Sequence, residues 1–517
     1  MSATKTAVLF RAFQPEQRAV FYSCFLLPAC LLVAGCSSKK TELAWTVDFP
    51  VIGSQSSPRA ADLNQDGILD IVIGAGQNEK QHAKQGIIAL DGKTGQLLWQ
   101  QESTDQVFGS PTFNDVTGDG IPDVFIGGRR PQFYAINGKD GALIWSYTYK
   151  YQDDPILKYA HYNFNNTVLV PDQNGDGIPD LLAINGGNPE AAPYSETDRY
   201  PAVLMIINSK TGDIIAADTM PDGKESYMAP LCFSQPGSPD MSILFGTGGE
   251  TISGNLYRCT LQDLLDKKLS NARVIASETG HGFIAPPTLA DINGDGFYDI
   301  VAISHGSSVF AIDGKSLETL WQRKIPGTES SNSFAAGYFT ADDIPDFFTF
   351  VSKGEWPNST GSLQIMLDGA TGAIAYQDSM GCTGFSSPVV YDLNHDGRDE
   401  AIISINEFDC STGFTGNAPR TMVNKLLAVN FKDNSVQLID EAQGLKNIFT
   451  TPWIGDLDQD GYLDIVHFRY FHYQDLVSFL GMNARRISTN VRIRKPVIWG
   501  AYRGTNGDGI FRKSGDR

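Results

Sequence analysis

The stretch Asp62-Leu63-Asn64-Gln65-Asp66-Gly67-Ile68-Leu69-Asp70 decides the fold of this 517-residue chain. Short acidic or amide side chains stand at positions 1, 3, 5 and 9 of this stretch, and a glycine stands at position 6. Carboxylates on alternate residues of a tight loop can converge on one hard cation, and the glycine lets the chain turn back sharply. Residues 71–73 are all β-branched and predict a strand. The stretch therefore predicts a calcium loop that leads into a strand.

The same pattern returns five more times, and repeats of this kind determine the fold. A seventh copy, Tyr338 to Asp346, lacks the first carboxylate and the glycine. The loops are not EF-hands, because position 12 is Ile73 in the first loop rather than a bidentate Glu. The alternative is a set of Asp/Asn/Gly turns that bind no metal. The predicted calcium ligands are Asp62, Asn64, Asp66 and Asp70; Asp115, Thr117, Asp119 and Asp123; Asp172, Asn174, Asp176 and Asp180; Asp291, Asn293, Asp295 and Asp299; Asp392, Asn394, Asp396 and Glu400; and Asp456, Asp458, Asp460 and Asp464.

Each repeat also has a small-small-Pro entry, such as Ser56-Ser57-Pro58, and an Asp-Gly or Asn-Gly turn that predicts a hairpin. The gap from Asp172 to Asp291 is twice the usual period, so it contains a unit without an acidic loop. The chain is therefore predicted to be all-β, with residues 43–503 forming an eight-bladed β-propeller of four-stranded blades and seven blades as the alternative. The orphan strand at Leu43–Val47 is expected to close the last blade, and 504–517 form a C-terminal tail.

The N-terminus reads as an export signal, with an apolar run at residues 19–35 that ends in Val-Ala-Gly before Cys36. This pattern resembles a bacterial lipoprotein signal. The resemblance implies that residues 1–35 are removed, that Cys36 carries lipid, and that 36–42 form a tether in the bacterial cell envelope, with the outer membrane favoured. The alternatives are an ordinary signal peptide or a membrane-anchoring helix.

Charge and cysteine use fit an exported protein. The net charge of −19 argues against a nucleic-acid partner and against anionic lipid. Four cysteines remain after the lipoprotein segment, and four cysteines allow three disulfide pairings. Pairing sequence neighbours closes the shortest loops, Cys232 with Cys259 and Cys382 with Cys410; the alternative is four free thiols.

The acidic loops resemble the FG-GAP (VCBS-type) repeats of integrin α-subunit propellers and of many bacterial surface proteins. The Ala89–Trp99 turn also resembles the tryptophan-docking repeat of quinoprotein dehydrogenases and of the outer-membrane barrel-assembly lipoprotein. These resemblances imply a propeller fold and several bound Ca²⁺ ions, but they specify no activity.

In a propeller, the acidic loops and the hairpin turns share one face, and the longer connections lie on the other face. Long loops on a rigid scaffold concentrate binding residues. The candidate ligand-binding residues in these connections are Arg129, Arg130, His161, His281, His305, Trp356, His467, Arg469 and Tyr470. The aromatic run 468–473 has ordinary packing between blades as its alternative.

Three functions compete. The first is a calcium-stabilised binding or scaffold module for an envelope or extracellular protein or glycan, attached to the membrane only through its lipid. The second is a polysaccharide lyase, because the chain is similar in outline to some rhamnogalacturonan lyases; Arg129, Arg130 and His161 or His281 would then act on the substrate. The third is a quinoprotein dehydrogenase, although the sequence has no adjacent cysteine pair of the kind those enzymes commonly carry.

Overall fold

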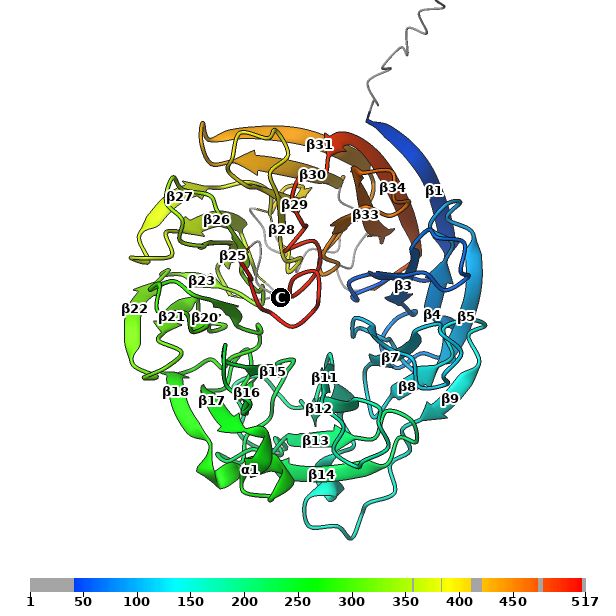
Figure 1. Ribbon diagram of the computed structural model, residues 1–517, viewed down its shortest axis with the longest axis vertical. Coiled ribbons are helices and arrows are strands. Elements are labelled where there is room, and N and C mark those ends of the chain that lie inside the picture. Colours follow the sequence, from blue (N-terminus) through cyan, green and yellow to red (C-terminus); the bar gives the residue numbers. More distant parts are fainter. Residues whose placement is uncertain (1–40, 356–357, 383, 411–420, 473–477, 514–517) are drawn as a thin grey trace, which may run out of the picture. The chain divides into compact units, whose positions relative to one another are not determined.

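Four-stranded antiparallel blades, one for each sequence repeat, are the units of this structure. The structure is a computed structural model that describes residues 41–513 except 356–357, 383, 411–420 and 473–477. Eight blades follow one another around a centre, as the colours in Figure 1 show. The chain is therefore the predicted all-β, eight-bladed propeller and not the seven-bladed alternative, and the described blades belong to one compact unit, Lys40–Arg517.

The first four blades carry their strands in chain order from the centre outward. Blade 1 contains β2 (Arg59–Ala61), β3 (Asp70–Gly74), β4 (Ala83–Leu90) and β5 (Leu97–Ser103). Blade 2 contains β6 (Thr112–Asn114), β7 (Asp123–Gly127), β8 (Phe133–Ile136) and β9 (Leu143–Ser146). Blade 3 contains β11 (Val168–Val170), β12 (Asp180–Gly186), β13 (Val203–Ile207) and β14 (Ile214–Thr219), with the short β10 (Asn163–Phe164) also paired to β12. Blade 4, the unit without an acidic loop, contains β15 (Leu231–Ser234), β16 (Met241–Gly246), β17 (Gly254–Thr260) and β18 (Arg273–Glu278).

The other four blades repeat this order. Blade 5 contains β19 (Thr288–Ala290), β20 (Asp299–Ile303), β21 (Ser308–Ile312) and β22 (Thr319–Lys324). Blade 6 contains β24 (Ala335–Gly337), β25 (Asp346–Lys353), β26 (Gly361–Leu367) and β27 (Ile374–Asp378), with β23 (Thr328–Glu329) also paired to β25. Blade 7 contains β28 (Val389–Tyr391), β29 (Glu400–Glu407), β30 (Val423–Asn430) and β31 (Ser435–Gln443). Blade 8 contains β32 (Trp453–Gly455), β33 (Tyr462–Phe471), β34 (Gly481–Arg492) and, as its outer strand, β1 (Glu42–Pro50).

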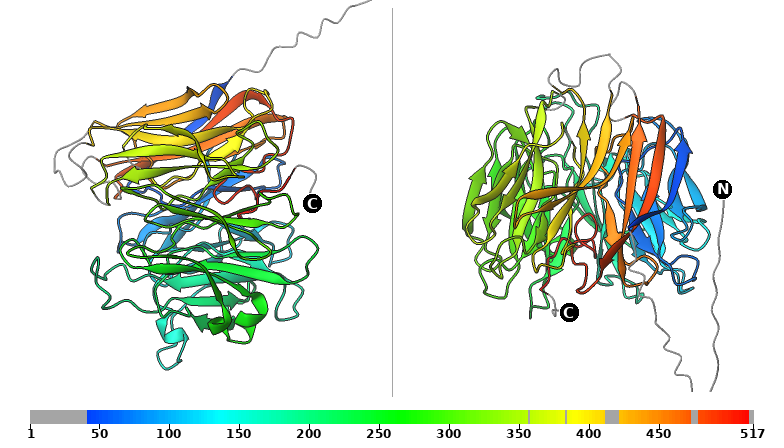
Figure 2. Two further views of the ribbon diagram at one scale, coloured as in Figure 1. Left: turned by 90° about the vertical axis from the view of Figure 1, so that its left-hand side faces the viewer. Right: turned by 90° about the horizontal axis from the view of Figure 1, so that it is seen from above.

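The burial of each strand follows from its place in the blade. The second strands are almost fully buried, as in β3, because both of their faces pack against neighbouring blades. The outer strands are mostly exposed, and in β5 Leu97 is exposed whereas Trp99 is buried. The side view in Figure 2 shows the strands running between two faces that carry the connecting loops.

The ring is closed by pairing between the two ends of the chain. Strand β1 runs antiparallel to β34, from Glu42 opposite Ser488 to Pro50 opposite Gly481, and the two lie side by side in Figure 1. The indole of Trp45 donates a hydrogen bond to the carbonyl of Gly92 in blade 1 at 2.8 Å. The predicted closure by the N-terminal strand is confirmed, and it supplies the fourth strand of blade 8.

The same docking contact joins other neighbouring blades. Trp99 donates to the Gly138 carbonyl at 2.7 Å, and Trp321 donates to the Gly369 carbonyl at 2.8 Å. A glycine in each turn lies directly on the ring: a Cβ at Gly95, whose φ is +73°, would approach Trp45 Cε3 to 2.6 Å. The repeated Gly and Trp of the sequence therefore form one contact between successive blades.

The centre of the ring holds the C-terminal segment, residues 499–513 (Figure 1). This segment includes residues 504–513 of the tail predicted from the sequence. The backbone of Val390 donates to Trp499, and Leu289 donates to Gly509, so the segment pairs with inner strands of different blades. Trp499 and Phe511 are buried there. The guanidinium of Arg59 donates to backbone carbonyls of the same segment, which ties blade 1 to it.

The remaining elements are short: the helix α1 (Leu261–Leu265) and the 3₁₀ turns η1 (Leu157–Tyr159) and η2 (Leu269–Asn271). Among the described residues, no helix has the length and apolar character needed to cross a membrane. The signal segment 1–35, Cys36 and most of the tether lie outside the described residues.

One of the two expected disulfides is present. Cys382 and Cys410 are bonded, with their Cα atoms 5.7 Å apart. The pairing of Cys232 with Cys259 is wrong, since both are free and both lie opposite Ile243, on the two strands that flank β16. Strands two apart are separated by roughly 10 Å, which exceeds the span of a disulfide.

Candidate functional site

The acidic loops connect the first and second strands of blades 1, 2, 3, 5, 7 and 8, and all six have one backbone geometry. In every loop the carboxylate at position 1 accepts a hydrogen bond from the glycine N–H at position 6, at 2.7–3.2 Å. The position 5 carboxylate accepts from the N–H two residues later. The position 9 carboxylate accepts from the N–H at position 2. The carboxylates at positions 1, 5 and 9 therefore bind the same backbone N–H groups in each copy.

Position 9 is buried, and in blades 1, 2 and 5 it links the loop to the hairpin turn of its blade. Asp70 Oδ1 accepts from the N–H of Gly92 in the hairpin turn at 3.0 Å, and Asp299 makes the same bond to Gly314 at 2.8 Å. Burial raises the pKa of Asp70 and of Asp299 to about 6. Burial, with Asp392 and Asp396 nearby, raises the pKa of Glu400 to about 7. Burial destabilises the ionised form of these carboxylates, and a bound cation would stabilise it.

The loops also contain carboxylate oxygens with no hydrogen-bond partner. Asp62 Oδ1, Asp180 Oδ1 and Asp458 Oδ1 are buried and unpaired. Oxygen is the ligand atom that Ca²⁺ prefers. The donor set therefore fits a calcium ion, and positions 1, 3, 5 and 9 are the residues that would hold it.

The last loop differs because an arginine lies against it. Ligand oxygens of Asp456, Asp458 and Asp464 lie within 4.8 Å of one another. Arg486 donates to Asp458 Oδ2 at 2.5 Å and to Asp464 Oδ2 at 3.0 Å. This loop thus already has a positive charge between two of its carboxylates.

A central pocket lies on the opposite face and receives residues from all eight blades. Its volume is about 400 Å³, within the range typical of ligand sites. Most lining residues lie in the connections that enter each blade, and Tyr502 comes from the C-terminal segment. The lining residues are Gln55, Ser57, Phe108, Ser110, Arg129, Asn163, Asn165, Asn166, Pro189, Tyr227, Ala229, Glu250, Ile284, Ser331, Phe385, Phe449 and Tyr502.

The pocket combines flat rings with polar donors. Phe385 and Phe449 stack on each other with ring centroids 5.6 Å apart. The guanidinium of Arg129 lies 5.6 Å from the Phe108 ring and forms an ion pair with Glu79 at 2.6 Å. The amide nitrogens Gln55 Nε2 and Asn165 Nδ2 are buried and have no hydrogen-bond partner. Both side chains line the pocket, and each has an amide nitrogen whose hydrogen-bonding capacity is unused.

The structure places the predicted ligand-binding residues in different parts of the molecule. Arg129 lines the pocket, and His281 and His305 lie together beside it, in contact with lining residues. Arg130 pairs with buried Asp105 at 3.2 Å instead of lining the pocket. His161 packs against Tyr149 and Tyr162 outside the pocket lining. Trp356 lies outside the described residues.

His467, Arg469 and Tyr470 are not surface residues, and this prediction is wrong. Strand β33 continues to Phe471, so the three side chains are buried inside blade 8. His467 Nε2 lies 3.0 Å from Asn424 Oδ1, and Arg469 forms an ion pair with Asp440. Phe468 and Tyr470 of the aromatic run pack between blades, as the alternative interpretation stated, and residue 473 lies outside the described residues.

The sequence interpretation missed several pocket residues. Asn163, Asn165 and Asn166 line the pocket, and Asn166 Oδ1 accepts a hydrogen bond from the Ser110 N–H at 2.9 Å. Glu329, which lies against His305, was missed as well. In the sequence, these residues were marked only by their position next to the small-residue entries of the blades. At two of these entries, the Ser57 N–H donates a hydrogen bond to Ser110 Oγ at 3.1 Å.

Comparisons with known proteins agree with the fold. The family model described as outer membrane protein assembly factor BamB matches residues 83–175, which include the Ala89–Trp99 turn. A europium-containing methanol dehydrogenase is similar with a TM-score of 0.54 at 9% identity, over 87% of this chain and 93% of that chain. A quinohemoprotein alcohol dehydrogenase from Comamonas testosteroni has a TM-score of 0.51 at 11% identity, over 89% and 78% of the two chains. A comparison with curated protein sequences gives no match.

Proposed function

We propose that this protein is a calcium-stabilised binding module of the bacterial cell envelope, and that its central pocket holds part of a glycan. The observation that carries the proposal is the pair of unpartnered amide donors, Gln55 Nε2 and Asn165 Nδ2, in a pocket that also contains stacked rings and Arg129. A sugar presents hydroxyl oxygens that such donors can bind and C–H faces that pack on aromatic rings. A volume of about 400 Å³ suits a short stretch of a glycan rather than a protein surface.

The scaffold role of calcium is proposed from the acidic loops. Their unpartnered oxygens and buried carboxylates favour a bound cation, and the resemblance to FG-GAP repeats supports calcium. A cation bound only by the folded loops stabilises the blades by mass action. In this proposal the loops support the pocket from the far face and do not contact the ligand.

The envelope location rests on two sequence features. Cys36 is proposed to carry a lipid anchor, and the match of residues 83–175 is to a family described as an outer membrane protein assembly factor. The same match supports the alternative that the bound partner is an envelope protein.

The test is a binding screen of the purified full chain against immobilised envelope and extracellular polysaccharides in calcium. Asn165→Ala and Arg129→Ala are expected to weaken binding about tenfold or more, because each removes a polar contact to a buried ligand. Arg130→Ala is the matched control, since this arginine neighbours Arg129 but does not line the pocket. No retained glycan, or equal binding by the pocket variants, would overturn the proposal. Unsaturated or shortened products would make the protein a lyase, and retention of an envelope protein alone would identify a protein partner.

A further inference from the structure

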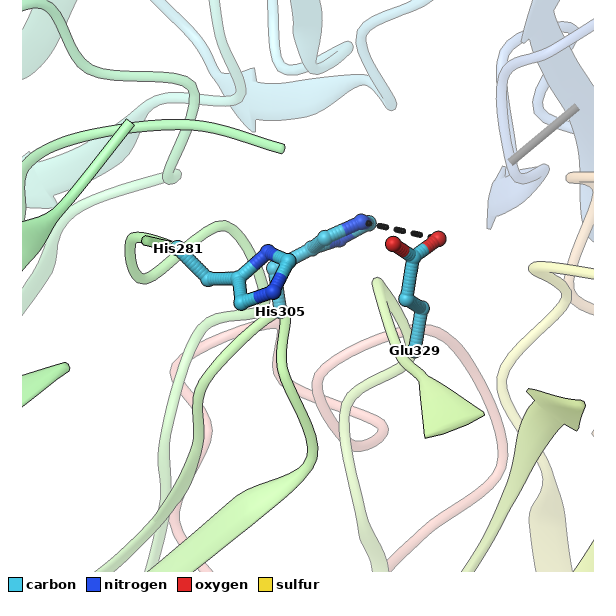
Figure 3. Close-up of side chains that lie close together, drawn as sticks. All are labelled: His281, His305 and Glu329. Atoms are coloured by element: carbon cyan, nitrogen blue, oxygen red, sulfur yellow. Dashed lines mark ion pairs between the residues drawn. The ribbon is translucent and has the colours of Figure 1, made fainter. Parts of the chain in front are cut away.

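Two histidines and a glutamate meet beside the central pocket, although they come from three separate segments (Figure 3). His281 lies in the connection between β18 and β19, His305 lies in that between β20 and β21, and Glu329 ends β23. One ring nitrogen of each histidine and one carboxylate oxygen lie within 4.8 Å of one another. Sequence spacing does not reveal this cluster, because 48 residues separate its ends.

The hydrogen bonds of His281 determine which nitrogen is available. Its Nδ1 lies 2.6 Å from the carbonyl oxygen of Glu250, a residue of the pocket lining. A carbonyl can only accept, so Nδ1 carries the proton and Nε2 of the neutral ring keeps its lone pair. A metal-binding histidine commonly has this arrangement, with its other nitrogen donating to a carbonyl.

The ring of His305 also has a partner at Nδ1, a hydroxyl that can accept its proton. Its Nδ1 lies 3.2 Å from Ser331 Oγ, which also lines the pocket. Its Nε2 is buried and makes no hydrogen bond, although Glu329 Oε2 is 3.4 Å away. Both side chains are largely buried, with 1% of His305 and 7% of Glu329 exposed. A buried polar nitrogen without a hydrogen bond requires a physical explanation.

The separation of 3.4 Å between His305 Nε2 and Glu329 Oε2 is long for a hydrogen bond but suits two ligands of one metal ion. A zinc ion lies 2.0–2.2 Å from nitrogen and oxygen ligands in a tetrahedral arrangement, which places neighbouring ligands roughly 3.3–3.5 Å apart. An ion at this position would give the buried Nε2 of His305 the partner that it lacks.

We propose that His281, His305 and Glu329 bind one divalent transition-metal ion of the zinc class. Two imidazoles favour zinc over calcium, which takes oxygen ligands, so this site differs chemically from the acidic loops. Three protein ligands leave a fourth position for water or for an oxygen of a molecule in the adjacent pocket. The site goes beyond the proposed glycan-binding function and does not depend on it.

The test uses the purified full chain, stripped with chelator and then kept in excess calcium so that the acidic loops are occupied. Titration calorimetry with Zn²⁺ is expected to show one site per chain, and Co²⁺ is expected to produce a visible absorption band there. His281→Gln and Glu329→Gln are expected to weaken Zn²⁺ binding by roughly 10- to 100-fold or more. His161→Gln is the matched control, because its Nδ1 also faces a backbone carbonyl, that of Lys158 at 2.8 Å, but it lies outside the cluster.

Two results would overturn the proposal: a full chain that binds no Zn²⁺ in calcium, or His281→Gln binding Zn²⁺ as tightly as the unaltered chain. Glu329 is buried, so its variant tests the site only if its melting temperature in calcium is unchanged. His281 is partly exposed, and its replacement decides the question if the glutamate variant fails to fold.

Discussion

The two faces of the propeller are built on different principles. On the acidic-loop face, blades 1, 2, 5 and 6 repeat one contact, in which the buried aspartate binds the turn glycine: Asp70 with Gly92, Asp123 with Gly138, Asp299 with Gly314 and Asp346 with Gly369. On the pocket face, the connections contribute a more varied set of side chains, among them Arg129 in blade 2, Asn165 in blade 3 and Glu250 in blade 4. Repetition therefore builds the scaffold, and the irregular connections carry the chemistry of the candidate site.

The largest effect is expected from removing calcium, because it acts on several loops at once. Each loop that binds calcium only in the folded state contributes about 2.7 kcal/mol at a calcium concentration of 100 times its dissociation constant. The melting temperature of the full chain, measured by calorimetry, is expected to fall by many degrees in chelator and to recover in calcium. Magnesium at equal concentration is the control, since it requires a different coordination geometry. An unchanged melting temperature in chelator would show that the acidic loops are turns that bind no metal.

Loss of the tryptophan contact that closes the ring is expected to have the next largest effect on stability. Trp45→Ala removes a side chain that is 7% exposed and donates to Gly92, and it is expected to lower the free energy of unfolding by about 3–5 kcal/mol. Leu43→Ala on the same strand is the control, because Leu43 is 49% exposed and its loss is expected to change stability by less than about 0.5 kcal/mol. Denaturant titration measures both variants. Similar values for the two would mean that the docked tryptophan does not hold blade 8 to blade 1.

The difference between the faces explains what the sequence could predict. The eight blades and the closure by β1 follow from the repeated acidic loops, hairpin turns and tryptophans, which fix local geometry in each copy. The pocket residue Asn165 and the His305–Glu329 pair belong to segments that no repeated motif marks, so only the folded ring brings them to the site. His467 and Arg469 were predicted to lie in a connection because polar residues interrupt the strand pattern there, whereas in the fold both extend β33 and have partners in blade 7.

A pair of variants tests the separation between the faces directly. Asp66→Ala removes one carboxylate of the first acidic loop, and its cost in calcium is expected to approach the contribution of one occupied loop, about 2–3 kcal/mol. Its glycan affinity is expected to be unchanged, whereas Arg129→Ala is expected to lose affinity at nearly full stability. Calorimetric melting and binding measurements on the same two preparations give all four values. Loss of binding by a fully stable Asp66→Ala protein would place the ligand on the acidic-loop face.

The smallest expected effect concerns His467, which the sequence suggested for the ligand face and the fold places inside blade 8. Burial, together with Arg469 and Arg485 nearby, holds the pKa of His467 well below 6.5, so the folded ring stays neutral. The unfolded chain binds a proton there below its pKa of about 6.5, and stability is therefore present above that pH and lost as the pH falls. At pH 5 this loss is expected to reach about 2 kcal/mol.

The measurement is the free energy of unfolding between pH 7 and pH 5 for the unaltered chain and for His467→Gln. The carboxylates Asp70 and Asp299, whose pKa values burial raises to about 6, act in the opposite direction, because the folded state takes up their protons first. Both proteins contain these carboxylates, so the difference between the two curves isolates His467. The difference is expected to vary by about 2 kcal/mol over this range, while the glycan affinity of His467→Gln stays unchanged. If the two stability curves are parallel and His467→Gln binds glycan more weakly than the unaltered chain, His467 contributes to ligand binding. The scaffold would then carry part of the recognition chemistry.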